Sequence, residues 1–197
     1  MMEKICAFLG GITPYIENRK IPKYYENIKA SRSAIILQLC KMIAESSDFP
    51  EEKSLMIAAE ICEIGEITID NEIVQKEGTL SESDWEIIEN HPKESLRILD
   101  PILDPSPNLR LIKEMILNHH PWYKNGGYLP EDLDEVTSFG CRILATCLAY
   151  SAMAFPRYYR KEIPASEIIE HLENEMVNKY DPEIVAMLKK CMRADGN

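Results

Sequence analysis

Three of the four histidines in this chain occur where they could bind a metal ion: His91, His119 and His120 each lie at or near the end of a predicted helix. The neutral imidazole is the commonest transition-metal ligand among side chains. The tandem pair His119-His120 is the most suggestive feature. Spacing does not show convergence, so buried or helix-capping histidines are the alternative interpretation. The fourth, His171, lies among glutamates and is expected on a solvated helix face.

These histidines need a helical framework, and the apolar pattern provides one. Apolar residues recur at helical spacing throughout, without the sustained alternation of strands. The stripe over 112–119 places His119 on the inward side of its helix. Ser81 and Asp84 form a capping-box signal, and Gly65 is a plausible helix stop. We expect helices over 31–44, from 51 to about Gly65, from Ser81 to His91, over 112–119, and over 139–153, 166–176 and 182–192.

The resulting fold class is all-α, with one principal domain. Residues 1–28 are predicted to form an N-terminal appendage, and residues 29–197 a helical domain. A content of 45% hydrophobic and 28% charged residues is typical of a globular protein. The net charge of −11 argues against nucleic acid and anionic membrane as partners, because both need a basic surface.

The cysteines and the first residues bear on the compartment. None of the six cysteines forms a Cys-x-x-Cys pair, and most lie in apolar helical stretches, where a free cysteine packs as a small hydrophobe. The opening apolar run is shorter than a signal h-region or a membrane span. We therefore expect a cytoplasmic protein.

Short segments occur in a recognisable order along most of the chain. In chain order they are 58–67, 76–85, His91-Pro92, His119-His120, 126–130, 142–145, 157–160 and Asp181-Pro182. Together they resemble the HD-GYP domain, an all-helical module of the HD superfamily of metal-dependent phosphohydrolases. Segment 76–85, for example, reads Lys-Glu-Gly-Thr-Leu-Ser-Glu-Ser-Asp-Trp where the family has Lys-Pro-Gly-x-Leu-Thr-x-x-Glu-Trp. The shared order implies an HD-GYP-like multi-helix bundle related to cyclic di-GMP phosphodiesterases.

The resemblance also indicates which family residues are missing. In active members, histidines and aspartates hold two or three metal ions that activate a water for attack on the phosphodiester. The upstream histidine and the late aspartate of the family fall on Ala30 and Leu148, and the His-Asp pair on Cys62-Glu63. The lysine near the substrate phosphate is Glu66, which would repel an anionic diester. Cys62, Glu63 and Glu66 are thus remnant catalytic positions, and no catalytic residue is assigned.

A second metal position of the family is better preserved. By the resemblance, one ion could be held by Glu63, His91, His119 and His120. Such ligands suit Fe, Mn, Zn or Ni, so we expect one divalent transition metal or, alternatively, an empty hydrogen-bonded cluster. Tyr128, Arg157 and Arg160 are candidate substrate-binding residues, with ordinary surface residues as the alternative. The Gly-Tyr-Pro loop of the family is altered at Lys124 and Leu129.

Three functions stay open at this point. The first is a catalytically inactive or impaired HD-GYP-like signalling domain, a pseudoenzyme that binds a signalling protein or a nucleotide. The second is a residual phosphohydrolase that uses one metal ion. The third is a structural or oligomerisation module without a ligand. The missing ligands and Glu66 favour the first, and the sequence does not determine the oligomeric state.

Overall fold

The computed structural model describes residues 23–76, 78–103, 108–124, 126–127, 137–156, 161–176 and 178–194, with side chains from residue 32 onward except 175 and 194. Within these ranges the regular elements are helices, and the only extended pairing is an isolated bridge between Pro121 and Gly127. The all-α prediction is confirmed. The elements are α2 (Lys23–Ser46), α3 (Glu52–Ile61), η1 (Cys62–Thr68), α4 (Asn71–Val74), α5 (Glu82–Glu89), α6 (His91–Leu99), α7 (Leu109–Leu117), α8 (Phe139–Ala154), α9 (Ala165–Glu170), η2 (His171–Glu175) and α10 (Pro182–Ala194).

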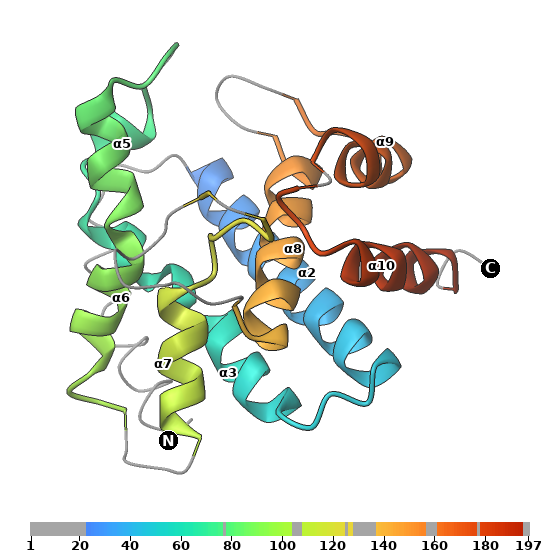
Figure 1. Cartoon of the computed structure of the whole chain (residues 1–197). Helices are drawn as coiled ribbons and strands as arrows, with labels where there is room; N and C mark the ends of the chain where they lie inside the picture. Colours follow the sequence, from blue (N-terminus) through green and yellow to red (C-terminus); the bar gives the residue numbers. More distant parts are fainter. Residues whose placement is uncertain are drawn as a thin grey trace.

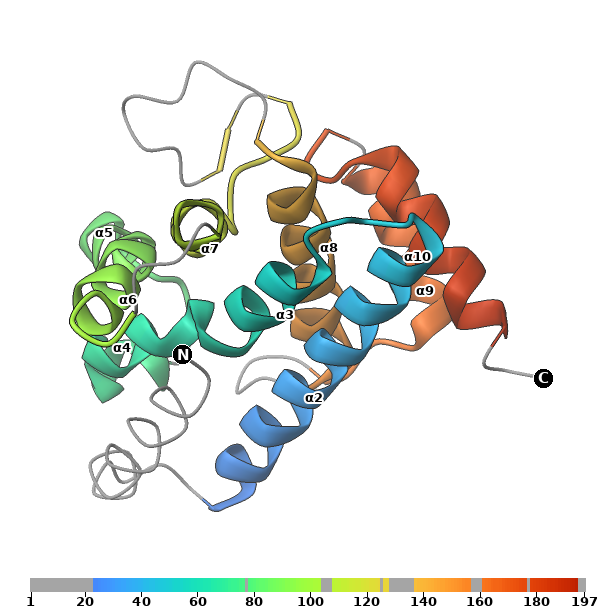
Figure 2. The ribbon, with the colours of Figure 1, turned by 90° about the horizontal axis from the view of Figure 1, so that it is seen from below.

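Helix α8 lies at the centre of the core (Figure 1). It is apolar on most of its surface, and a helix that is apolar all round must be covered on all sides. Figure 2 shows α8 among α7, α3, α2 and α10, and each of these helices contacts it. Cys141, Ile143, Leu144 and Cys147 of α8 are fully buried. The predicted helix over 139–153 is confirmed within one residue at its end.

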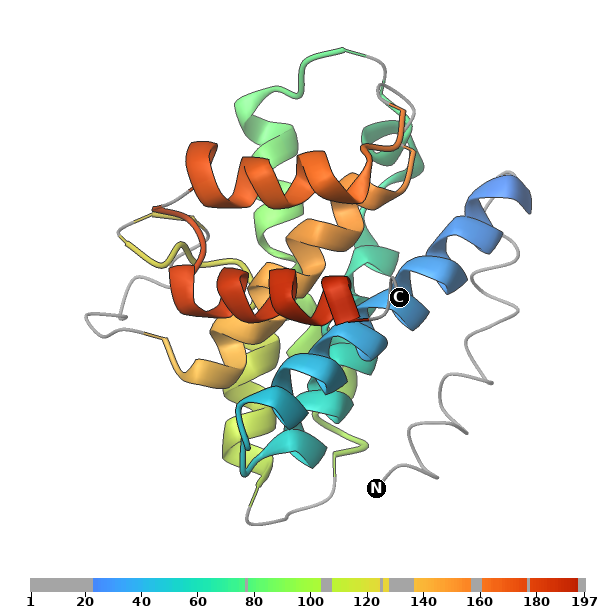
Figure 3. The ribbon, with the colours of Figure 1, turned by 90° about the vertical axis from the view of Figure 1, so that its right-hand side faces the viewer.

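The last two helical segments cover one flank of α8. Figure 3 shows α9 and α10 side by side, and both contact α8. The predicted helix over 166–176 is an α-helix that ends at Glu170 and continues as a π-helical turn over η2. His171 begins this turn and is half-buried, so the expectation of a solvated face was wrong in part. Helix α10 confirms the prediction over 182–192.

The segment around His91 differs from the sequence prediction. The capping box of Ser81 and Asp84 is present and begins α5, as predicted. Pro92, however, lies in the first turn of a further helix, α6, which the sequence analysis did not predict. Proline is tolerated there because the first N–H groups of a helix have no intrahelical acceptor. His91 is therefore the first residue of a helix.

Gly65 also has a different role from the predicted one. Helix α3 ends at Ile61, and the chain continues through Gly65 as the 3-10 helix η1. A Cβ atom at Gly65 would lie 2.0 Å from the backbone oxygen of His91. The glycine is needed for this close approach of η1 to α6, and not to stop the helix.

The start of the chain is only partly described. Helix α2 begins at Lys23, earlier than the predicted 31, while residues 1–22 lie outside the described part. The division at residue 28 therefore stays a prediction. Among the described helices, none is both long and apolar enough to span a membrane.

Candidate metal centre

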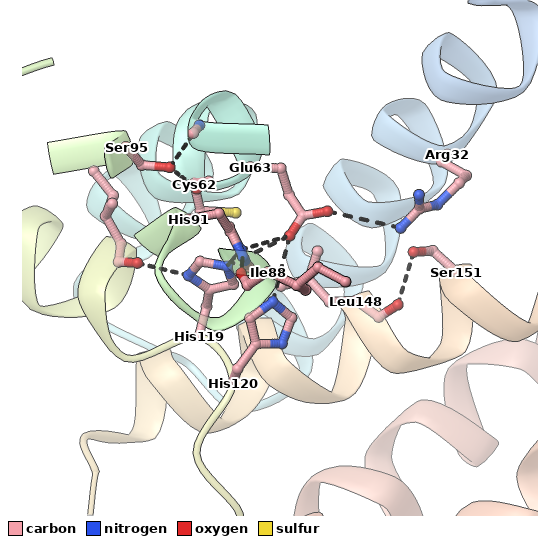
Figure 4. A network of polar contacts seen from close by, with 12 residues as sticks. Arg32, Cys62, Glu63, Ile88, His91, Ser95, His119, His120, Leu148 and Ser151 are labelled. Atoms are coloured by element: carbon pink, nitrogen blue, oxygen red, sulfur yellow. Dashed lines mark hydrogen bonds and ion pairs between the residues drawn. The ribbon is translucent and has the colours of Figure 1, made fainter. Parts of the chain in front are cut away.

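Four side chains from three elements converge at one point. Glu63 comes from η1, His91 opens α6, and His119 and His120 lie just beyond α7, after its C-cap residue Asn118 (Figure 4). Each offers one ligand atom, and these atoms all lie within 4.8 Å of one another. The structure thus brings together the four residues that the resemblance names as ligands of one ion. We call these residues the four-ligand cluster: Glu63, His91, His119 and His120.

The separations within the four-ligand cluster suit a single ion. Oε1 of Glu63 lies 3.5 Å from Nε2 of His91, 3.4 Å from Nε2 of His119 and 3.5 Å from Nε2 of His120. Nε2 of His91 lies 3.0 Å from Nε2 of His119. Two ligands that are each about 2.1 Å from one ion lie about 3.0 Å apart at a right angle and about 3.4 Å apart at a tetrahedral angle. These four distances therefore match the edges of one coordination shell.

Backbone carbonyls fix the orientation of two imidazoles. Nδ1 of His91 lies 2.7 Å from the oxygen of Ile88, and Nδ1 of His119 lies 2.6 Å from the oxygen of Ile116. A carbonyl only accepts, so each Nδ1 donates, and a neutral ring then presents the lone pair of Nε2 to the centre. Two such lone pairs 3.0 Å apart repel unless a proton or a cation lies between them. This arrangement is typical of metal-ligating histidines.

The electrostatics of the cluster also favour a cation. Burial disfavours the charge of Glu63, but the hydrogen-bonding contacts of the three imidazoles outweigh it and hold the pKa well below its usual range. Burial likewise opposes a charge on His91, yet the Glu63 carboxylate raises the pKa of that ring. Burial and the neighbouring His119 lower the pKa of His120 to about 4. Near pH 7 the site thus offers an ionised carboxylate and a neutral His120, the forms that bind metals.

Ser95 and Gly65 hold η1 against α6 and so position the ligands. Ser95 Oγ donates to the backbone oxygen of Cys62 at 2.6 Å and accepts from the N–H of Gly65 at 2.8 Å. The missing Cβ of Gly65 allows this approach. Glu63 lies in η1 between Cys62 and Gly65, the two residues that Ser95 bonds. His91 lies one helical turn before Ser95 in α6. Sequence analysis missed Ser95, although its spacing of four residues from His91 was a usable signal.

The cluster is open on one side. The side chain of His119 is fully buried and that of His91 is 4% exposed, whereas Glu63 and His120 are 25% and 30% exposed. Glu63 and His120 are therefore the members of the cluster that meet solvent.

Two of the positions that lack family ligands lie in the core. Cys62 is fully buried and Leu148 is 3% exposed, and both belong to the hydrophobic core. Burial raises the pKa of the Cys62 thiol well above its usual value, so it stays neutral and packs. Glu66 is a half-buried residue of η1. Ala30 belongs to α2, but its side chain lies outside the described part.

One charged residue near the site was missed by the sequence analysis. Arg32 of α2 points toward Glu63 in Figure 4, with its Nη2 3.8 Å from Oε2 of that carboxylate. Its side chain is 9% exposed, which is rare for arginine. The only signal was a basic residue within an otherwise apolar helical stretch. The predicted substrate-binding residues Tyr128, Arg157 and Arg160 lie outside the described residues, as does Leu129; Lys124 is exposed.

Comparisons with known proteins agree with the fold. The sequence profile of the HD domain family matches residues 19–184. A cyclic di-GMP phosphodiesterase of Thermotoga maritima is 31% identical over 137 residues, which cover 69% of this chain and 36% of that protein. The 3'3'-cGAMP-specific phosphodiesterase 3 of Vibrio cholerae is 28% identical over 135 residues, covering 68% of this chain and 28% of that protein. The chain thus spans about a third of the length of these relatives.

Solved structures share the helical arrangement. An HDG"Y"P protein from Bdellovibrio bacteriovorus superposes with a TM-score of 0.63 at 14% identity, covering 82% of this chain and 51% of that one. The HD domain of the phosphodiesterase PgpH from L. monocytogenes gives a TM-score of 0.58 at 13% identity, covering 85% and 90%. At these identities the likeness concerns the fold alone. The family match over residues 19–184, the related phosphodiesterase sequences and the shared fold together show that this chain belongs to the HD domain family and is HD-GYP-like within the HD superfamily.

Proposed function

We propose that this chain is an HD-GYP-like signalling domain that binds one divalent transition metal and a phosphate-bearing nucleotide, but does not cleave cyclic di-GMP. The observation that carries the proposal is the contrast within the site. Four separations within the four-ligand cluster match the edges of one coordination shell, whereas Cys62 and Leu148 are neutral residues of the core. One metal position is complete, and its neighbour lacks its ligands.

The residues of the cluster are prepared for the ion. A divalent metal bound there supplies a Lewis acid that polarises a phosphoryl oxygen and lowers the pKa of a bound water. His91 and His119 are held by carbonyls of the preceding turns, so their Nε2 atoms need no rearrangement to act as ligands. His120 and Glu63 border the open side, where a nucleotide phosphate would approach.

In a two-metal mechanism of diester cleavage, the two ions stabilise the attacking and the leaving oxygen, so a second ion needs ligands of its own. The described residues contain no further group of three or more histidine, cysteine, aspartate or glutamate ligands. Leu148 offers no ligand atom, and the Cys62 thiol is uncharged. The nucleotide class follows from the relatives, which are named as cyclic di-GMP and 3'3'-cGAMP phosphodiesterases.

The experiment combines metal content with hydrolysis. The protein is purified without oxygen, loaded in turn with Fe²⁺, Mn²⁺ and Zn²⁺, desalted and analysed by inductively coupled plasma mass spectrometry. We expect about one equivalent of metal, a large loss in His120→Ala, and none in the control His171→Gln, which alters the histidine outside the cluster. The loaded protein should not hydrolyse cyclic di-GMP. Metal-dependent hydrolysis that His120→Ala abolishes would refute the non-cleaving role, and absence of metal would refute the site.

A second candidate is hydrolysis of small phosphate monoesters with one metal. The open side at Glu63 and His120 favours it, since a single Lewis acid can generate a nucleophilic water. Turnover of p-nitrophenyl phosphate by the loaded protein, lost in Glu63→Gln, would support this candidate. No turnover above the metal-free protein would exclude it.

A further inference from the structure

Arg32 is a buried cation whose hydrogen-bond donors are not fully used. Its side chain is 9% exposed, and Nη2 lies 3.8 Å from Oε2 of Glu63, longer than an N–H···O hydrogen bond. Its Nε is buried and has no hydrogen-bond partner among the described residues. Buried donors without an acceptor are rare in proteins, and each calls for an explanation. The side chain points into the site and faces the carboxylate (Figure 4).

A second arginine gives the contrast. Arg142 also has a buried Nε without a partner in the described part, but its Nη1 donates to the buried carboxylate of Asp181. Its guanidinium also lies over the rings of Tyr123 and Phe139. Arg142 therefore has a hydrogen-bonded carboxylate and aromatic contacts, as expected of a structural arginine. Arg32 has an ion pair at 3.8 Å in their place.

We propose that Arg32 binds an oxygen of a phosphate group next to the metal of the four-ligand cluster. Glu63 faces both partners: Oε1 faces the three Nε2 atoms, and Oε2 faces Arg32. A phosphate beside this carboxylate would therefore have a positive group on either side. The guanidinium is always charged, and its fork of N–H groups matches phosphate oxygens.

The charge of the whole chain favours such a residue at an anion site. A protein with a net charge of −11 repels an approaching anion unless a local positive group reverses the field. Arg32 supplies such a positive charge from α2, next to Glu63. The inference rests on the proposed function, because the metal provides the second positive charge.

The test uses inorganic phosphate as the ligand and zinc-loaded protein. Phosphate affinity is measured by isothermal titration calorimetry for the wild type, Arg32→Gln, Arg32→Lys and Lys41→Gln. Lys41→Gln is a matched control, because this substitution removes one positive charge from an exposed part of α2. We expect Arg32→Gln to bind phosphate at least about tenfold more weakly, Arg32→Lys to be intermediate, and Lys41→Gln to equal the wild type. Zinc content and circular dichroism accompany each titration, and Arg32→Lys keeps the test valid if Arg32→Gln unfolds.

The outcomes separate this inference from the function on which it rests. Equal phosphate affinity of the wild type and a folded Arg32 variant would overturn the inference. Zinc-loaded wild type that does not bind phosphate would overturn it too, although the metal site would stand. Loss of zinc in Arg32→Lys in step with loss of phosphate would show that Arg32 acts on Glu63 alone, and would also overturn it. Wild-type protein without zinc would refute the proposed function itself.

Discussion

The two sides of Glu63 differ in their chemistry. On one side, three imidazoles converge on Oε1, with two of them fixed by backbone carbonyls. On the other side, Arg32 faces Oε2. Leu148 and the Cys62 thiol, where the resemblance expects further ligands, are neutral residues of the core. The imidazole side thus has the ligands of a metal site, whereas the core positions contribute neutral packing and Arg32 a fixed cation.

The difference shows what a buried site requires when an ion is missing. Buried carboxylates that face one another without a cation are costly, whereas a leucine or a neutral thiol is not. Glu63 is the exception because its charge is balanced by contacts on both sides. The core side therefore contributes to stability, and the histidine side to binding. This separation can be tested by substitutions on each side.

The largest effect is expected at the residue that both sides share. Glu63→Gln removes the only anionic ligand of the four-ligand cluster and keeps its shape. Since loss of a residue that merely orients a ligand costs about 10–100-fold in metal affinity, we expect a loss of at least about 100-fold. Zinc affinity measured by competition with a chromogenic chelator checks it, with His171→Gln as the control. Unchanged affinity would mean that the carboxylate is not a ligand.

On the core side the expected effect is on stability. Leu148→Ala should lower the free energy of unfolding by about 2–5 kcal/mol, because it leaves a cavity in the core. Urea unfolding of the metal-free protein measures this change. The folded fraction should still take up zinc as the wild type does. A variant that keeps its stability but loses zinc would show that the two sides are not separable.

A smaller effect on both properties is expected between the two sides, at Ser95. Ser95→Ala leaves the buried N–H of Gly65 without its acceptor and should cost about 1–3 kcal/mol of stability. Because η1 then loosens from α6, zinc affinity should fall about tenfold. Ser151→Ala is a matched control, since that buried hydroxyl donates to Leu148 within its own helix. Equal zinc affinity of the two variants would contradict the positioning role of Ser95.

The smallest effect lies away from the site, in the capping box of α5. The side-chain contact with Lys76 and the bonds from Ser81 lower the pKa of Asp84 from 3.8 to about 2. A carboxyl with a lowered pKa in the folded state stabilises the protein above its unfolded pKa and loses this contribution as pH falls. Stability should therefore decrease between about pH 4 and pH 2, and less in Asp84→Asn. The urea midpoints of the wild type and of Asp84→Asn at pH 5 and pH 2.5 test this. An equal fall of the midpoint in both proteins would contradict it.

Much of the fold follows from local patterns in the sequence. Helices α8 and α10 are apolar or amphipathic over their whole length, so their periodicity predicts them closely. His119 is buried as expected, but the predicted helix over 112–119 was wrong at its end: α7 stops at Leu117, and His119 lies beyond the helix. Helix α6 was missed because Pro92 was read as ending a helix, although proline is equally suited to a first turn. Gly65 was read as a stop because its contact with His91 involves a distant segment.

The candidate site depended on the family resemblance. Glu63 meets histidines that lie 28 or more positions away, and no local pattern encodes such contacts. The order of the family motifs supplied this information and named the four residues that the structure brings together. Arg32 and Ser95 belong to no motif quoted for the family, so the resemblance could not indicate them. Their roles depend on distances between α2, η1 and α6, which only the three-dimensional structure provides.

The central claim is that one side of Glu63 binds a single metal ion and the other does not. The most direct measurement is a crystal structure of zinc-loaded protein with anomalous data at the zinc edge. We predict one anomalous peak, about 2.0–2.2 Å from Nε2 of His91, His119 and His120 and from an oxygen of Glu63. A second peak toward Leu148, or no peak within the four-ligand cluster, would contradict the account.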